Sequence, residues 1–167
     1  MKKSASIVLL CWLAMAGADF LLHGGLLAGY YMQETPFLRP MAEAFRLIPL
    51  GYAGLFLLAI LLTWVVVNLN PVSTISAART GLLLGLLVSG GTLLGVISIS
   101  TIGSSLALAW SLSQTIQFII GAVVVAEASK ASSLRRITAK VVIFVVLSFL
   151  VTIALQSLGL VPTIRIQ

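Results

Sequence analysis

An aspartate and a histidine stand four residues apart inside the first long apolar stretch of the chain, residues 7–31. This spacing places the side chains of Asp19 and His23 on one face of a helix. A charged side chain at the centre of a membrane helix costs about 2.5–3.5 kcal/mol on insertion scales, so both groups should face polar partners. Ionisable groups inside a membrane are typical of sites that bind a proton or a ligand. This pair is therefore the first candidate site.

Two later apolar stretches carry polar side chains at a similar depth. Counted from the outer ends of the predicted spans at 1.5 Å per residue, these side chains lie about 10–18 Å below the membrane surface. Buried polar groups are costly unless they are hydrogen-bonded, so we expect them to converge. In the first stretch, the stripe of the aspartate and the histidine continues to Tyr30. The predicted buried polar cluster consists of Asp19, His23, Ser89, Thr92, Gln114 and Gln117.

Two interpretations of this cluster stay open. Interhelical hydrogen bonds in membranes contribute about 0.6 kcal/mol each, which is enough to fix the register of neighbouring helices. The cluster would then be structural. Alternatively, it is a proton or ligand site. No second acid lies in mid-membrane, so the sequence predicts no proton relay across the whole bilayer.

Motifs of known cofactor, metal and catalytic sites are absent from the sequence. It contains no phosphate loop, zinc-ligand spacing, dinucleotide fingerprint or Ser/His/Asp triad. Its one cysteine, Cys11, is expected to be an apolar packing residue. One histidine offers a haem one histidine ligand per chain, and a quinone or lipid beside Trp110 and Tyr30 is a further alternative. We expect no cofactor, no metal and no catalytic residue.

The composition is that of a membrane protein. Of the 167 residues, 60% are hydrophobic and 8% are charged, against about 25% charged in a soluble domain. So few charges could not cover a water-facing surface. The net charge of +6 comes from basic residues scattered between apolar spans, which indicates membrane topology rather than nucleic-acid binding.

Apolar stretches of sufficient length occur five times, and they predict an all-α transmembrane bundle that forms a single domain over residues 1–167. The connection between the first two spans holds three prolines and one amphipathic stretch, for which we expect a short interfacial helix over about 40–48. The predicted spans are about 7–30, 50–67, 80–101, 106–126 and 141–158. The 50–67 span is expected to be a scaffold or lipid-facing helix.

The third span is rich in glycine and is expected to be central. Gly81 and Gly85 form one G-x-x-x-G pair, and Gly91 and Gly95 form another. Small residues let helix backbones approach closely in lipid. The predicted packing face therefore meets another helix of the same chain or, alternatively, a second copy.

Basic residues predict the orientation. Seven of the ten lie at the N-terminus, in the 68–79 loop and in the 127–140 loop, which share one side of a five-span topology. The positive-inside rule places this side in the cytoplasm and the C-terminus outside.

Several of these residues resemble a pattern in uncharacterised small bacterial inner-membrane proteins. The shared features are Asp-Phe-x-x-His-Gly beginning at Asp19, then Arg39-Pro40, and a face with Trp110, Gln117 and Gly121. The resemblance covers about residues 7–126 and leaves the last span as an addition. It implies a multi-pass protein of the bacterial inner membrane and no particular activity.

Three functional hypotheses follow. The leading one is a non-enzymatic accessory subunit that packs in a membrane complex or against itself, because the loops are short and no reaction motif is present. The alternative is a small proton-linked transporter or ligand-binding membrane protein that uses Asp19 and His23. An enzyme or electron-transfer subunit is the third.

Overall fold

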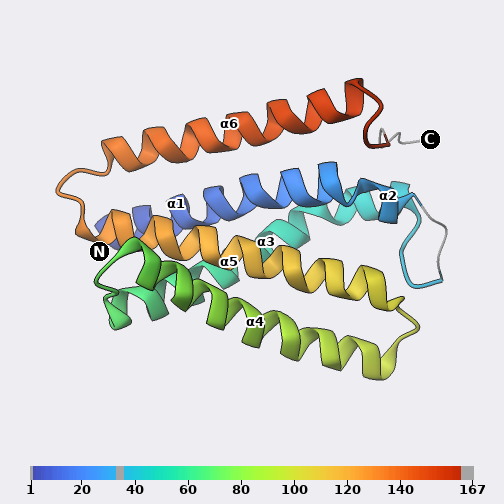
Figure 1. Cartoon of the computed structure of the whole chain (residues 1–167), viewed down its shortest axis with the longest axis horizontal. Helices are drawn as coiled ribbons and strands as arrows, with labels where there is room; N and C mark the ends of the chain where they lie inside the picture. Colours follow the sequence, from blue (N-terminus) through green and yellow to red (C-terminus); the bar gives the residue numbers. More distant parts are fainter. Residues whose placement is uncertain (1, 33–35, 163–167) are drawn as a thin grey trace.

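The computed structural model describes residues 2–32 and 36–162, and within them every regular element is a helix (Figure 1). This confirms the all-α fold. In chain order the elements are α1 (Lys2–Asp19), the π-helix η1 (Phe20–Leu26), α2 (Ala28–Tyr31), α3 (Met41–Leu69), α4 (Thr74–Ile99), α5 (Ser104–Lys130) and α6 (Arg135–Ser157).

Within the described residues, five helical segments are long and apolar enough to cross a membrane. The first combines α1 with η1, and the others lie in α3, α4, α5 and α6. Large apolar side chains cover the outside of these helices, including Leu57, Leu83 and Leu150. In water such a surface would be unfavourable, whereas in lipid it costs nothing. The prediction of five spans is confirmed.

The central helix is α5, and not α4 as the glycine pattern suggested. α5 contacts α1, α3 and α4, and its side chains Phe118, Ala122 and Val125 are fully buried (Figure 1). α4 packs closely against α5 alone, because only one of its faces consists of small residues and the others carry exposed leucines. α4 is therefore peripheral.

The connection before the second span differs from the prediction. Residues 41–48 do not form a separate interfacial helix, because they are the first turns of the continuous helix α3. Pro49 lies inside this helix, where it removes one backbone N–H bond. One missing bond does not end a helix whose following residues are strongly apolar.

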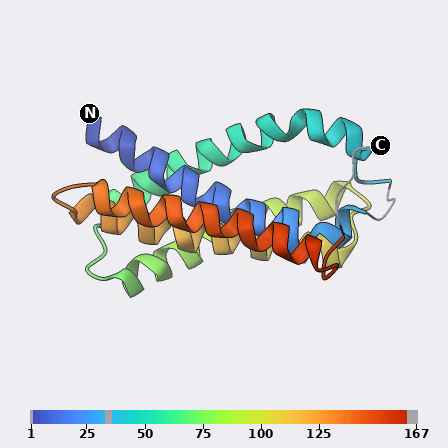
Figure 2. The same cartoon turned by 90° about the horizontal axis from the view of Figure 1, so that it is seen from above.

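The second half of α3, expected to be a scaffold or lipid-facing helix, has one buried face and one exposed apolar face. Leu55, Ala59, Leu62 and Val66 are buried against α1 and α5, whereas residues 46–51 are exposed. Figure 2 shows α3 diverging from α1 toward the end where α3 begins. The close contact in one half and the divergence in the other leave space between these helices.

The loops with most basic residues gather at the end of the bundle where α1 begins (Figures 1 and 2). The Lys3 ammonium donates hydrogen bonds to the carbonyl oxygens of Ser129, at 3.1 Å, and Ala131, at 3.0 Å. The Lys130 ammonium donates to the carbonyl of Pro71. These bonds join the start of α1 to the loops that follow α3 and α5.

Candidate functional site

A cavity of about 700 Å³ lies where α3 diverges from α1. Its wall is built by the end of α1, η1, α2, the first half of α3, and α5, and most of the wall is apolar. Leu38 and Arg39 line it in the connection before α3, and Leu58 lines it in the second half of that helix. The polar or aromatic polar side chains in the wall are Asp19, His23, Tyr31, Arg39, Tyr52, Trp110, Gln114 and Gln117.

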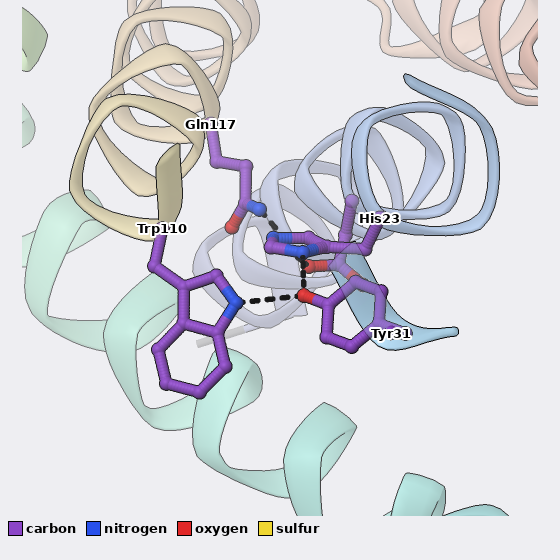
Figure 3. Close-up of polar contacts among 5 residues, drawn as sticks. His23, Tyr31, Trp110 and Gln117 are labelled. Carbon is purple, nitrogen blue, oxygen red and sulfur yellow. Dashed lines mark hydrogen bonds and ion pairs between the residues drawn. The ribbon is translucent and has the colours of Figure 1, made fainter. Parts of the chain in front are cut away.

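Asp19 is the last residue of α1 and stands at the start of the π-helix. Its carboxylate Oδ1 accepts a hydrogen bond of 3.0 Å from the Nε2 amide of Gln117 on α5 (Figure 3). The His23 Nε2 atom lies 3.7 Å from the same oxygen. Tyr52 places its hydroxyl beside this carboxylate. The Trp12 indole holds the Tyr52 backbone by donating to its carbonyl oxygen at 3.0 Å.

The other nitrogen of His23 belongs to a second chain of hydrogen bonds. His23 Nδ1 lies 2.5 Å from the Tyr31 hydroxyl oxygen, and the Trp110 Nε1–H donates to that oxygen at 2.7 Å (Figure 3). An indole N–H can only donate, so the Tyr31 oxygen is the acceptor there. The Tyr31 O–H has no other acceptor within the described part of the chain, so it donates to His23 Nδ1. This arrangement fits the neutral tautomer of His23 with its hydrogen on Nε2, facing Asp19.

Tyr31 keeps this role throughout the physiological pH range. Burial raises the pKa of its phenol to about 12. The hydroxyl therefore stays protonated and remains a donor. Through it, Trp110 fixes which nitrogen of His23 carries the hydrogen.

The π-helix decides which tyrosine reaches His23. The stripe predicted for an α-helix led from Asp19 and His23 to Tyr30, whereas Tyr31 makes the contact. In η1 the backbone forms wider turns, with Leu27 N–H bonded to the Leu22 carbonyl at 2.7 Å, so the later residues are rotated relative to an α-helix. α6 supports this segment, because the Gln156 amide donates to the Gly24 carbonyl at 3.0 Å. No feature of the sequence alone signals the π-helix.

The two predicted glutamines have different roles. Gln117 is only 3% exposed and is bonded to Asp19. Gln114 lies one turn nearer to Trp110, is half-buried, and lines the cavity. Its amide has no hydrogen-bond partner among residues 2–32 and 36–162. It can therefore donate to a bound molecule and accept from it.

Ser89 and Thr92 lie outside the cavity. The Ser89 hydroxyl is buried between α4 and α5, 2.9 Å from the Ser111 hydroxyl and 3.1 Å from that of Thr115. Thr92 is exposed and donates to the Val88 carbonyl of its own helix at 2.8 Å. Depth in the membrane matched these residues to Asp19, but α4 packs on a face of α5 that does not meet α1.

The predicted glycine face is divided in the same way. A Cβ atom added to Gly81 would lie 2.5 Å from the Phe118 carbonyl oxygen, and one added to Gly85 would lie 2.9 Å from the Thr115 Cα. These two glycines allow α4 to approach α5. A Cβ at Gly91 or Gly95 would meet nothing within 4 Å, so this part of the face has no partner in the described chain.

The described residues contain no group of three side chains suited to hold a metal ion. Cys11 is fully buried, with its thiol 3.7 Å from the Met15 sulfur, and lies apart from the cavity. The site thus offers one accessible carboxyl, one neutral imidazole, amides and aromatic faces. Comparisons with protein-family models, curated proteins and solved structures found no match for this chain.

Proposed function

We propose that this protein is a multi-pass membrane protein that binds a small molecule in the cavity beside Asp19. The observation that carries the proposal is the cavity itself, which combines a largely apolar wall with a few convergent polar groups. Its volume of about 700 Å³ lies within the range of sites for drug-sized ligands. Proton-linked transport is the activity that such a site would serve.

Two features of the wall support binding rather than a purely structural cluster. The Asp19 side chain is 30% exposed and the His23 side chain 25% exposed, although both lie in an otherwise apolar segment. A cluster that served only to fix the register of helices would be expected to satisfy its polar groups internally. The Gln114 amide, which has no partner among the described residues, and the accessible carboxyl of Asp19 are instead available to a ligand.

We place this protein in the bacterial inner membrane, with its N-terminus in the cytoplasm. The basic residues at the end where α1 begins support this orientation. The resemblance noted at Asp19, Arg39 and Trp110 supports the location. The cavity then lies in the outer half of the bundle, near Arg39.

Binding can be tested by native mass spectrometry with three bulky aromatic probes of different charge. The probes are triphenylphosphine oxide, which is neutral, the tetraphenylphosphonium cation and the tetraphenylborate anion. Gly54 lines the cavity, and a Cβ there would meet nothing, so Gly54→Trp should fill the space without disturbing the bundle. Gly91→Trp is the matched control, because that glycine is equally open but lies outside the cavity.

We expect at least one probe to bind one-to-one to the natural chain and to the Gly91→Trp variant, and none to bind to Gly54→Trp. If no probe binds to the natural chain, the proposed function is wrong. Equal binding to all three proteins would show that the probes sit on the lipid-facing surface, which would also contradict it.

A second candidate function is an accessory subunit that packs against another membrane protein or a second copy. The open glycines Gly91 and Gly95 favour it, because they leave a flat strip on α4 at which a helix could approach closely. Co-purification in mild detergent tests this candidate. A partner that is present with the natural chain and lost from Gly91→Trp, but kept by Gly54→Trp, would support it.

A further inference from the structure

The charges around Asp19 indicate which class of molecule the cavity takes. We infer that the ligand is a lipophilic organic cation, and that it competes with a proton for the Asp19 carboxylate. This inference rests on the proposed function and adds the chemical class of the ligand.

The first step is that no positive side chain in the described part of the chain neutralises Asp19. Its hydrogen bond comes from the neutral amide of Gln117, and His23 offers a neutral N–H because Tyr31 donates to its other nitrogen. Within the described residues, no lysine or arginine nitrogen lies within 4.0 Å of this carboxylate. An ionised Asp19 would therefore stand in the membrane without a counter-charge, which is costly.

The second step covers the other ionisable groups near the cavity. Tyr52 from α3 and Tyr31 from α2 are neutral phenols, and the side chains that α5 contributes do not titrate. Arg39 lines the cavity beyond these groups, but its guanidinium lies 3.4 Å from the Glu43 carboxylate and is 65% exposed. Its charge is therefore paired and solvated. From α6, the neutral Gln156 amide donates to the Gly24 carbonyl, and the neutral Thr152 hydroxyl lies beside Gly25.

The third step is the aromatic wall. Phe20, Tyr31, Phe45, Tyr52 and Trp110 all line the cavity. The faces of aromatic rings attract organic cations, by about 2 kcal/mol or more where water is excluded. A lipophilic cation in this cavity would contact an acid, aromatic faces and apolar surface together. An anion of the same shape would instead lie beside the negatively charged carboxylate.

These features make binding an exchange of one positive charge. In the empty cavity a proton on Asp19 removes its uncompensated charge. A cation that binds beside the carboxylate takes over this role, and the proton leaves to solvent. One proton is therefore released for each cation bound to protonated protein, so the apparent affinity for the cation should rise about tenfold per pH unit while Asp19 is protonated in the empty site.

The experiment compares the three probes on the purified full chain between pH 5 and 9. We expect tetraphenylphosphonium to bind at least tenfold more tightly than tetraphenylborate, which has the same shape and the opposite charge. Titration calorimetry in two buffers with different ionisation enthalpies should show the release of up to one proton. Asp19→Asn should lose both the pH dependence and at least tenfold in affinity. Glu43→Gln is the control acid near Arg39, and it should keep the pH dependence.

The outcomes separate this inference from the proposed function. If triphenylphosphine oxide or tetraphenylborate binds in the cavity as tightly as the cation, with no dependence on pH, the ligand class is wrong and the binding function stands. If no probe binds, both fail. Should Asp19→Asn not fold, proton release from the natural chain decides: cation binding without proton release at any pH contradicts the exchange.

Discussion

At the scale of single residues, the donor-only indole of Trp110 determines the state of His23. It occupies the Tyr31 oxygen as an acceptor, and the Tyr31 hydrogen then goes to His23 Nδ1. Protonation of His23 would place a second N–H against the same oxygen and leave the Tyr31 O–H without its acceptor. The two aromatic residues therefore favour neutral His23. This leaves Asp19 as the candidate for a charge among the described residues of its hydrogen-bonded cluster, while Arg39 in the same cavity wall is paired with Glu43.

The first prediction concerns this tautomer. The chain has one histidine, so ¹⁵N NMR of labelled protein reports on His23 alone. We expect Nδ1 to show the shift of an unprotonated nitrogen and Nε2 that of an N–H. Tyr31→Phe removes the donor and should move the signals toward a mixture of tautomers. Tyr30→Phe should leave the spectrum unchanged, because Tyr30 makes no hydrogen bond to His23. A protonated Nδ1 at neutral pH in the natural chain would contradict the prediction.

The second prediction separates the two glutamines. Gln117→Leu removes the donor that satisfies Asp19 in a buried position, which typically costs about 1–3 kcal/mol. Gln114→Leu removes an amide that has no partner within the described residues, so the free energy of unfolding should hardly change. Unfolding in mixed detergent measures both variants. We expect the order of the two variants in ligand affinity to be independent of their order in stability. Equal destabilisation by the two variants would contradict the different roles assigned to Gln117 and Gln114.

The polar residues illustrate how much of the site the sequence could predict. Helical spacing put Asp19 and His23 on one face, and depth put Gln117 at the level of Asp19, where the structure has the hydrogen bond. Depth was insufficient for Ser89, because it does not say toward which neighbour a helix turns. Tyr31 could not be found, since the rotation that brings it to His23 comes from the π-helix.

At the scale of elements, close helix contact is set by a few small residues in half of α4. Gly81 and Gly85 face the backbone of α5, whereas Gly91 and Gly95 face outward. The G-x-x-x-G pattern occurs twice within α4, and nothing in the sequence of this helix tells the two pairs apart. The same is true of α3, where the apolar residues look uniform but Ala59 is fully buried and Leu57 is exposed. Whether a residue is buried or exposed depends on which neighbouring helix its side faces, and this is known only from the fold.

The third prediction uses the two glycine pairs. An alanine at position 81 would bring its Cβ within 2.5 Å of the Phe118 oxygen and 2.7 Å of the Ile119 Cα, which are backbone atoms that cannot move independently of α5. Gly81→Ala should therefore destabilise the bundle by about 1–3 kcal/mol, as overpacking does. Gly91→Ala meets nothing and should be neutral or slightly stabilising. The midpoint of thermal unfolding in detergent measures both, and similar midpoints would show that the α4–α5 contact is looser than described.

At the scale of the whole molecule, the five spans place the start of α1 and the end of α6 at opposite ends of the bundle (Figure 1). Composition and the lengths of the apolar stretches were sufficient to predict this number of spans, because the bilayer requires about 20 apolar residues for each crossing. They could not predict the cavity. It depends on the divergence of α3 from α1, and apart from Tyr52 the residues of α3 that line it are glycines and apolar residues like those that face lipid.

The last prediction concerns the direction in which the molecule crosses the membrane. Seven basic residues of the described chain lie at the end where α1 begins, and translocating them would be unfavourable: Lys2, Lys3, Arg79, Lys130, Arg135, Arg136 and Lys140. A reporter fused after Ser132, between α5 and α6, should therefore score as cytoplasmic, and one fused after Gln167 as external. If both reporters score on the same side, α6 does not cross the membrane, and the five-span arrangement is contradicted. Opposite sides in the reverse order would keep the five spans but turn the molecule over, and the end of the cavity at Arg39 would then face the cytoplasm.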